Sequence, residues 1–491
     1  MGRVSRGLAR IIVVLRRAAT SPPITLEVES LDLEGNGVAH HEGKVVFVRG
    51  GLPGETVRAS VVRRKPRFDV AEVVSVDRQS NSRVTPRCPH FGVCGGCATQ
   101  HIDARAQVAF KQRALEDTLW HLGRVRARNI LPPIEGPTWG YRFRARLTVR
   151  QVAKKGGVLV GFHERGSSFV ADMSECHTLP PFISDLLLPL RRLTERLSIR
   201  ERMPQVEVAV GDGESRGACH PDQDDGPPGR GPRGENPTAL VFRVLDPPND
   251  ADLAEFCEFA AAHGIEPWLQ TKGPETAYLL CDAMGRRDAP QSALGYGLAE
   301  FGLRIPFLPT EFTQVNFAIN RQLLARAVRI LDPRPDDSVV DLFCGLGNFT
   351  LPLATRARQV LGIEGAAGLV ARARQNAVLN QTALLGAAGD PAGVTFRPAN
   401  LFNFEASDWA ALGRVDKLVI DPPRDGALAV SQALATASNR PSRIVYVSCN
   451  PATLARDLGI MVNTGGWTLK CAGVINMFPH TSHVESIAVL E

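Results

Sequence analysis

The last third of the chain repeats one order of segments: a short apolar run, a turn and a helical stretch. The apolar runs are SVVDLF, QVLGIE, VTFRPA, KLVIDPP and RIVYVSC, with ESIAVLE closing the chain. Helical stretches such as residues 366–380 stand between them. Apolar strands joined through helices are typical of a parallel, doubly wound sheet. We therefore expect an α/β domain over residues 299–491, with an antiparallel strand near its end.

Two regions of different character precede this domain. Residues 23–80 alternate short strand-like runs with Gly and Pro turns at intervals of about ten residues, which predicts a small β-barrel. Residues 81–298 mix a cysteine-rich loop, a helical segment and β-rich stretches, and we expect a central α+β domain there. Within it, residues 211–237 contain twelve Gly and Pro residues and no apolar periodicity, which predicts a flexible excursion between two strands.

The chain lacks any apolar run near the roughly 18 residues that a membrane helix needs. The longest N-terminal candidate, IIVVL, is also too short for the apolar core of a signal peptide. We therefore expect a cytoplasmic protein without membrane contact, and a monomer. Residues 1–22 are basic and predict a flexible arm, although a transit peptide or a start codon assigned too early would also give this composition.

Basic residues are unevenly distributed along the chain. The formal net charge of +6 is modest for 491 residues and says little about partners. Two clusters of cations nevertheless suit a phosphate backbone, although a solvated basic surface would look the same. The clusters comprise Arg63, Arg64, Lys65, Arg67, Arg78 and Arg83, and then Arg124, Arg126, Arg128, Arg142, Arg144, Arg146 and Arg150.

A glycine-containing turn follows the first strand of the α/β region. In DLFCGLGNFTLPLA, Gly345 and Gly347 allow a tight turn and close approach of a ligand. Glu364 ends the next strand about twenty residues later, where a carboxylate can accept hydrogen bonds from ribose hydroxyls. The loop lacks the full G-x-G-x-x-G pattern, which disfavours a dinucleotide and suits a nucleoside such as S-adenosylmethionine. A purely structural glycine turn is the alternative.

A carboxylate motif, DPPR at residues 421–424, follows a later apolar strand. Ligand-binding groups gather at such strand ends in open α/β sheets. Enzymes that methylate amino groups often carry an aromatic residue at the last position of a similar motif, where this chain has Arg424. An exocyclic amine is therefore a less natural target.

Cys449 lies directly after an apolar strand, in the polar turn SCNP. A buried cysteine is usually a small packing residue, which is the alternative here. A thiolate at a ligand-binding edge is, however, suited to adding to an electron-poor double bond such as carbon 6 of a pyrimidine. Glu485 begins the last apolar strand and could remove the proton from carbon 5, unless it is only a surface residue.

Cys88, Cys94 and Cys97 are spaced C-x5-C-x2-C, and Cys176 could supply a fourth ligand. Four thiolates can hold zinc or an iron–sulfur cluster, and spacing alone cannot choose between them. Disulfides are a third alternative, which the expected intracellular location disfavours.

These motifs together resemble the RNA uracil-5-methyltransferases, most closely the bacterial 23S rRNA enzymes of the uracil-1939 class. The resemblance covers about residues 23–491, apart from the Gly/Pro excursion and part of the central region. It is carried by FTQVN, DLFCGLGNFTLPLA, IDPPRDG, VSCNPATLARD and MFPHTSHVESIAVL.

The resemblance implies a Rossmann-like class I methyltransferase domain, preceded by an OB-type TRAM β-barrel and a central iron–sulfur domain. It implies Cys449 as the nucleophile and Glu485 as the proton acceptor, with Asp421 also in the catalytic group. It further implies a 4Fe-4S cluster on Cys88, Cys94, Cys97 and Cys176. The residues that it places around the S-adenosylmethionine donor are Gln314, Phe343, Asn348, Glu364, Asn400 and Asp421.

The expected activity is thus methylation of carbon 5 of a specific uridine in 23S rRNA, through a covalent bond from Cys449 to carbon 6. The same chemistry on another 23S uridine or on a tRNA is the first alternative. A non-catalytic iron–sulfur protein that binds RNA or assists ribosome assembly is an alternative of another class. The presence of Cys449, Asp421 and Glu485 favours the enzyme.

Overall fold

The computed structural model describes residues 22–212, 236–287, 292–384 and 393–491. The predicted basic arm and the Gly/Pro excursion lie outside these residues except at their ends. The chain forms two compact units: Met1–Ala114 with Pro479–His483, and Leu115–Phe478 with Val484–Glu491. No helix among the described residues is long and apolar enough to cross a membrane.

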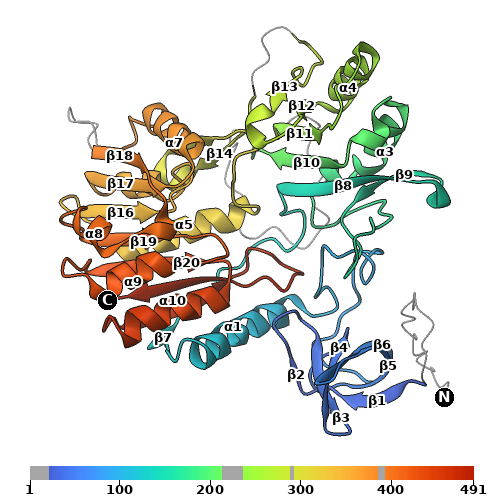
Figure 1. The fold of residues 1–491 in the computed structure, drawn as a ribbon, viewed down its shortest axis with the longest axis horizontal. Helices are drawn as coiled ribbons and strands as arrows, with labels where there is room; N and C mark the ends of the chain where they lie inside the picture. Colours follow the sequence, from blue (N-terminus) through green and yellow to red (C-terminus); the bar gives the residue numbers. More distant parts are fainter. Residues whose placement is uncertain (1–21, 213–235, 288–291, 385–392) are drawn as a thin grey trace, which may run out of the picture. The chain divides into compact units, whose positions relative to one another are not determined.

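The first unit contains a six-stranded sheet in the order β1-β5-β6-β4-β3-β2 (Figure 1). Its core is made of small aliphatic side chains that alternate with polar ones; Val57 and Ala59 are buried, and Arg58 between them is exposed. This confirms the β domain predicted for the N-terminal region. The strands are β1 (Ile24–Glu27), β2 (Ser30–Leu31), β3 (Gly37–His41), β4 (Lys44–Arg49), β5 (Thr56–Arg64) and β6 (Phe68–Arg78).

A segment from near the C-terminus completes the first unit. The N–H groups of Ala98 and Thr99 donate to the carbonyl oxygen of His480 at 2.9 and 3.0 Å. Gln107, in helix α1 (Ala104–His121), accepts the N–H of His480 at 2.8 Å and places its side-chain amide nitrogen 3.2 Å from Nδ1 of that histidine. The boundary between the two units falls within α1.

A second six-stranded sheet lies in the second unit, in the order β13-β12-β11-β10-β8-β9. Neighbouring strands are antiparallel except for β11 and β12. One face is covered by α4, whose Phe256 contacts Phe242 of β11. The elements are β8 (Arg144–Val152), β9 (Gly157–Gly161), α2 (Pro181–Ser184), α3 (Leu187–Arg196), β10 (Gln205–Val210), β11 (Thr238–Arg243), α4 (Asp250–His263), β12 (Glu266–Gln270) and β13 (Tyr278–Leu279).

The C-terminal part of the second unit is an eight-stranded sheet in the order β18-β17-β16-β19-β20-β22-β21-β7 (Figure 1). The strands β18, β17, β16, β19 and β20 are mutually parallel, and β22 is antiparallel to β20. This confirms the predicted doubly wound sheet with an antiparallel strand near the end of the chain. The strands are β7 (Asn129–Ile130), β16 (Ser338–Leu342), β17 (Gln359–Glu364), β18 (Gly393–Pro398), β19 (Lys417–Ile420), β20 (Arg443–Ser448), β21 (Leu469–Ile475) and β22 (Glu485–Leu490).

Helices alternate with these strands, as the apolar runs predicted. A two-stranded hairpin of β14 and β15 precedes the first helix, α5. The elements are β14 (Gly295–Leu298), β15 (Leu303–Pro306), α5 (Phe317–Leu331), α6 (Thr350–Ala354), α7 (Ala367–Leu379), α8 (Ala406–Ala410), α9 (Leu428–Thr436) and α10 (Pro451–Asn463).

One apolar cluster joins the two sheets of the second unit. Val241 and Trp268 of the six-stranded sheet belong to the same buried cluster as Phe317 of α5 and Val445 of β20. Burial of apolar surface is the main favourable term in such packing. The two sheets therefore share one core, and the loops between them are held from both sides.

Candidate active site

Five predicted site residues lie at the carboxyl ends of five neighbouring strands. Phe343 follows β16, Glu364 ends β17, Asn400 follows β18, Asp421 follows β19 and Cys449 follows β20. Because these strands are parallel, their carboxyl ends meet at one edge of the sheet, where ligands bind in folds of this kind. The structure thus brings these residues to one edge, as the sequence patterns predicted.

Glu485 reaches the same edge from the opposite direction. It is the first residue of β22, which runs antiparallel to β20, and Ser486 pairs with Ser448. Glu485 precedes one member of that pair and Cys449 follows the other, so the two lie next to each other across the ladder. Nothing in the spacing of the sequence indicates this pairing, because 35 residues, counted from Asn450 to Val484, separate them.

The catalytic candidates share an acidic environment, in which Glu485 is buried and Cys449 and Asp421 are half-buried. Burial first, and then the negative charges of Glu485 and Asp421, raise the pKa of the Cys449 thiol to about 12. Burial and Asp421 raise the pKa of Glu485 to about 8, and burial raises the pKa of Asp421 to about 7. The guanidinium of Arg424 opposes the shifts of Cys449 and Glu485. A carboxyl group with a pKa near 8 is a stronger base than an ordinary one.

The glycine loop turns sharply between β16 and α6. Phe343, Gly345 and Gly347 have φ angles of +64°, +56° and +93°, in the left-handed region. The carboxylate of Glu364 accepts the N–H of Gly345 at 3.1 Å and the N–H of Ala366 at 2.9 Å. Glu364 therefore fixes the loop as well as ending the neighbouring strand, and each of its oxygens keeps a further lone pair for a ligand.

The other predicted donor-site residues have structural contacts of their own. Asn348 forms a reciprocal amide pair with Asn320, with both N···O distances 3.0 Å, and accepts the hydroxyl of Tyr296 at 2.8 Å. Asn400 accepts the N–H of Phe402 at 3.0 Å. Gln314 lies half-buried in the loop between β15 and α5, away from the strand ends in sequence.

Asp341 is a site candidate to which the sequence analysis gave no role. It is fully buried in β16 and accepts the Thr350 hydroxyl at 2.6 Å. Burial, with added repulsion from Asp421 and Glu364, raises its pKa to about 8. The available signal was a carboxylate inside the apolar run SVVDLF, since buried acids without a cation are rare in strands.

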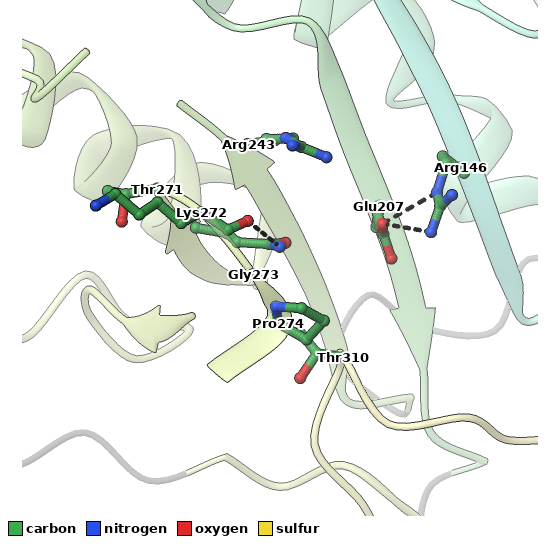
Figure 2. A pocket seen from close by; sticks show the side chains of 9 residues that line it. Arg146, Glu207, Arg243, Thr271, Lys272, Gly273, Pro274 and Thr310 are labelled. Carbon is green, nitrogen blue, oxygen red and sulfur yellow. Dashed lines mark hydrogen bonds and ion pairs between the residues drawn. The ribbon is translucent and has the colours of Figure 1, made fainter. Parts of the chain in front are cut away.

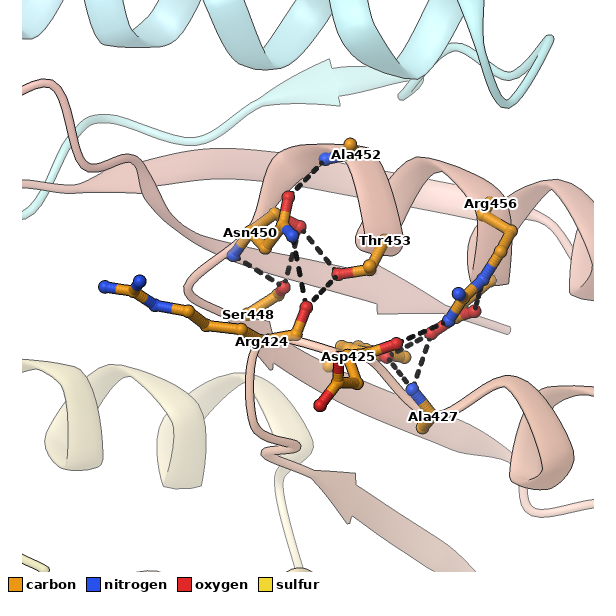
Figure 3. Close-up of polar contacts among 10 residues, drawn as sticks. Arg424, Asp425, Ala427, Ser448, Asn450, Ala452, Thr453 and Arg456 are labelled. Carbon is orange, nitrogen blue, oxygen red and sulfur yellow. Dashed lines mark hydrogen bonds and ion pairs between the residues drawn. The ribbon is translucent and has the colours of Figure 1, made fainter. Parts of the chain in front are cut away.

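The motif YVSCNPATLARD does more than supply Cys449. Asp457 accepts the N–H of Ala427 and the hydroxyl of Tyr446, both at 2.7 Å. From the same motif, Asn450 donates to the carbonyl oxygen of Arg424 at 3.1 Å (Figure 3). These contacts hold the turn after β19 against the start of α10. The positions of Asp421 and Cys449 are therefore set by one network, which the sequence did not reveal.

Of the four predicted cluster ligands, Cys88, Cys94 and Cys176 are buried and Cys97 is half-buried, and none of them forms a disulfide among the described residues. The N–H of Gly96 donates to Sγ of Cys94 at 3.3 Å. The first three belong to the first unit, and Cys176 belongs to the second. Within the described residues, no group of three or more His, Cys, Asp or Glu side chains is arranged to hold a metal ion.

Comparison with protein families gives two matches. Residues 303–491 match the family described as tRNA (Uracil-5-)-methyltransferase, and residues 24–74 match the TRAM domain. The first match covers the hairpin β14-β15 in part, α5 and the strand-edge residues. The second covers β1 to β5 of the first unit and the first part of β6.

Similar proteins cover nearly the whole chain. The chain is 55% identical over 468 residues to the 23S rRNA (uracil(1939)-C(5))-methyltransferase RlmD of Bordetella avium, spanning 95% of this chain and 90% of that protein. It is 54% identical over 479 residues to the protein of the same name from Burkholderia pseudomallei, spanning 95% and 94%.

A solved structure is also similar over most of the chain. It is that of the Pyrococcus abyssi tRNA (uracil-54, C5)-methyltransferase in complex with S-adenosyl-L-homocysteine. The TM-score is 0.66 at 20% identity, and the match spans 95% of this chain and 100% of that one. At this identity, the likeness is one of fold.

Proposed function

The chain belongs to the family of 23S rRNA (uracil(1939)-C(5))-methyltransferases, and we propose on that premise how the residues at its sheet edge act. The enzyme transfers a methyl group from S-adenosylmethionine to carbon 5 of uridine 1939 in 23S rRNA. The observation that carries the proposed mechanism is the antiparallel pairing of β20 with β22, which sets Cys449 beside Glu485.

We propose that the donor binds over the loop between β16 and α6. A Cβ atom built on Gly345 would meet nothing within 4 Å, so the loop leaves open space there. When bound, S-adenosylmethionine supplies an electrophilic methyl group on a sulfonium, and the buried carboxyl groups at this edge favour a positive charge. The residues proposed to line the site are Gln314, Phe343, Asn348, Glu364, Asn400 and Asp421.

Cys449 forms a temporary covalent bond to the base. Its Sγ adds to carbon 6 of the uracil ring, the thiol proton leaves to solvent, and the electron pair of the double bond makes carbon 5 nucleophilic. Carbon 5 then takes the methyl group. The raised pKa of Cys449 means that the thiol is protonated in the free protein, so ionisation accompanies the binding of the base. Extruding the uridine costs a few kcal/mol and is least costly in an RNA loop.

Glu485 completes the reaction as the general base. Its carboxylate removes the proton from carbon 5, the carbon 5–carbon 6 double bond re-forms, and the bond to Sγ breaks. Burial and then the charge of Asp421 raise the pKa of Glu485 to about 8, which makes its carboxylate a stronger base once it is deprotonated. One proton is released per methyl group transferred.

Two variants test this division of roles. Cys449→Ala should abolish methyl transfer and leave donor binding intact, whereas Glu485→Gln should accumulate a covalent protein–RNA adduct that survives denaturing electrophoresis. Cys471→Ala and Glu491→Gln are matched controls, since both residues lie toward the edge of the sheet opposite Glu485. Normal turnover by Cys449→Ala, or turnover without adduct by Glu485→Gln, would contradict the mechanism.

The substrate is tested by mapping the methylated base after incubation with unmodified 23S rRNA and tRNA. We expect labelled methyl on the 23S rRNA. Binding should involve the first unit, where the match to the TRAM domain lies. Label on tRNA alone would assign the same chemistry to the alternative RNA.

A 4Fe-4S cluster on Cys88, Cys94, Cys97 and Cys176 remains a separate proposal. It is supported by the donor chemistry of four cysteine side chains, which form no disulfide within the described part of the chain, and by the N–H of Gly96 directed at Sγ of Cys94. The proposed methyl transfer does not pass through it. Protein purified without oxygen should show an absorbance band near about 400 nm and contain iron and sulfide. Stoichiometric zinc without iron would overturn the proposal.

A further inference from the structure

The six-stranded sheet of the second unit has a face that is only half covered. Strand register places Arg146, Glu207, Val241 and Trp268 in one row across this face, and Val241 and Trp268 are buried in the shared core. The next row contains Gln205, Arg243 and Gln270, all of them polar. Val241 and Trp268 thus pack on the methyltransferase fold, whereas Arg146 and Arg243 are exposed.

A pocket of about 530 Å³ occupies this open end (Figure 2). Arg146, Glu207 and Arg243 line it from the sheet, and Lys272 lines it from the loop after β12. Thr310 closes it from the segment that connects β15 with α5. Figure 2 shows the Arg146–Glu207 pair and Arg243 on neighbouring strands.

The pocket has an excess of positive charge. Glu207 neutralises Arg146, at 2.9 Å, and also accepts the side-chain amide of Gln205 at 2.7 Å. Arg243 and Lys272 are exposed, and within the described part of the chain neither has an ion pair. Two cations therefore remain available to an anionic ligand.

The chemistry of the lining indicates phosphate rather than a base. The pocket contains guanidinium, ammonium, amide and hydroxyl groups, and none of the residues lining it is aromatic. Stacking of bases requires aromatic rings, whereas phosphate oxygens are bound by Arg, Lys and neutral hydrogen-bond donors. Arginine in particular offers paired donors that match phosphate geometry.

The segment that closes the pocket leads into the donor site. Arg144 of β8 donates to the carbonyl oxygen of Pro309 at 2.6 Å and lies 3.5 Å from the Thr313 hydroxyl. Gln314, a proposed donor-site residue, is next in the chain. Thr310 therefore lies four residues from the donor site, in a segment pinned to the same sheet that forms the pocket.

We propose that this pocket binds a backbone phosphate of the substrate RNA, in the strand that flanks the target uridine, chiefly through Arg243 and Lys272. The inference rests on the proposed function, since it takes RNA as the substrate. Phosphate contacts set the register of an RNA on a protein without reading its sequence. The pocket thereby helps to align the strand whose uridine reaches Cys449.

The double variant Arg243→Gln/Lys272→Gln tests the pocket, with an unmodified 23S rRNA fragment as the probe. We expect its Kd to rise roughly tenfold, and the slope of log K against log salt to fall by about 0.7, since the contact with one phosphate of a single strand is lost. The KM for RNA should rise in parallel, with kcat and donor affinity unchanged. A merely structural role of these residues would not change the salt slope.

Two further variants complete the test: one is a control away from the pocket, and the other increases the positive charge available in the pocket. Arg356→Gln/Arg358→Gln removes the same charge from exposed positions before β17, at the edge of the eight-stranded sheet opposite the donor site. This variant should leave the RNA affinity and the salt slope as in the wild type. Glu207→Gln releases Arg146 and should tighten RNA binding several-fold.

Unchanged RNA affinity and salt slope in the pocket variant would overturn the proposal, as would equal losses in the control. Failure of the wild type to methylate 23S rRNA would instead refute the proposed function. Direct measurement of RNA binding keeps the two outcomes apart.

Discussion

Among the residues that the structure describes, Arg424 is the cation that opposes the raised pKa values of both Cys449 and Glu485. Its side chain is exposed, whereas its carbonyl oxygen is fixed by Asn450 and Thr453 at 3.1 and 3.2 Å. At the position where amino-group methylases carry an aromatic ring, this chain thus places a charge that eases ionisation of the proposed nucleophile and the proposed base.

The pH dependence of kcat/KM should reveal this charge. In the wild type, the rate should rise with pH through about 8, because Glu485 must be deprotonated to act as a base. Arg424→Gln removes the group that lowers both pKa values, so the rising limb should move to higher pH. A lower rate with an unmoved limb would show that Arg424 acts on substrate binding alone.

Asp341 should make the protein less stable as the pH rises. Its pKa is about 8 in the folded protein and close to the ordinary 3.8 when unfolded. Its contribution to stability is therefore fully present below about pH 4 and is lost as the pH rises through about 8. Asp341→Asn should be more stable than the wild type at pH 8, and the difference should shrink toward pH 4, as measured by denaturant unfolding.

Asp246→Asn is the matched control for this measurement. Asp246 is exposed, and its ion pair with Arg202 lowers its pKa. The same change of side chain there should produce no gain in stability at pH 8. Equal pH profiles for Asp341→Asn and the wild type would show that Asp341 is ionised without cost.

At the scale of elements, the turn between β19 and α9 depends on one glycine. Gly426 has a φ angle of +75°, and a Cβ atom there would lie 2.6 Å from Oδ2 of Asp457 and 2.9 Å from Cβ of Thr453. The side chains that hold this turn thus leave no room for a larger residue. The turn follows Asp421 directly, so its position matters to the site.

Gly426→Ala should destabilise the protein by about 1–3 kcal/mol and lower kcat/KM, because both the left-handed backbone and the contact with Asp457 are strained. Gly413→Ala isolates the first effect, the strain of the left-handed backbone. Gly413 has a similar φ of +70°, but a Cβ atom there would meet nothing within 4 Å. Equal losses of stability and activity in the two variants would show that the contacts of Gly426 are unimportant.

Strands, helices and turns were predictable where the pattern that indicates them lies within one continuous segment of the sequence. The parallel strands, the glycine loop and the residues at the strand ends were predicted from apolar runs and from the turn residues that end them. The pairing of Glu485 with Cys449 depends on strand order, which a single run does not encode. The network around Asp457 was likewise not predictable, because Asp457 and Asn450 bind backbone groups of Ala427 and Arg424, and a backbone group does not depend on the type of residue that carries it. The roles of the predicted site residues remain to be tested by the variants above.

At the scale of the molecule, the first unit is built from both ends of the chain. Gln107 is buried, and its side chain contacts the backbone and the ring of His480. Replacing Gln107 with Leu keeps the volume but removes these hydrogen bonds, which should cost about 1–3 kcal/mol.

Hydrogen exchange should report this loss at residues 479–483 first. In Gln107→Leu, the amides of His480 and its neighbours should exchange faster than in the wild type. Gln151→Leu, at an exposed position of β8, is the control and should leave exchange there unchanged. Protection equal to the wild type in Gln107→Leu would mean that other contacts suffice to hold the segment.

The threading of Pro479–His483 into the first unit also limits how such a gene can be rearranged. A module that ends before the next begins can be exchanged, duplicated or split off as a cassette. Here no single break in the chain yields two complete units. The N-terminal fragment would lack Pro479–His483, and the C-terminal fragment would carry that segment without the residues of the first unit that it contacts. The RNA-binding module and the strand that begins with Glu485 must therefore be inherited, engineered and expressed together.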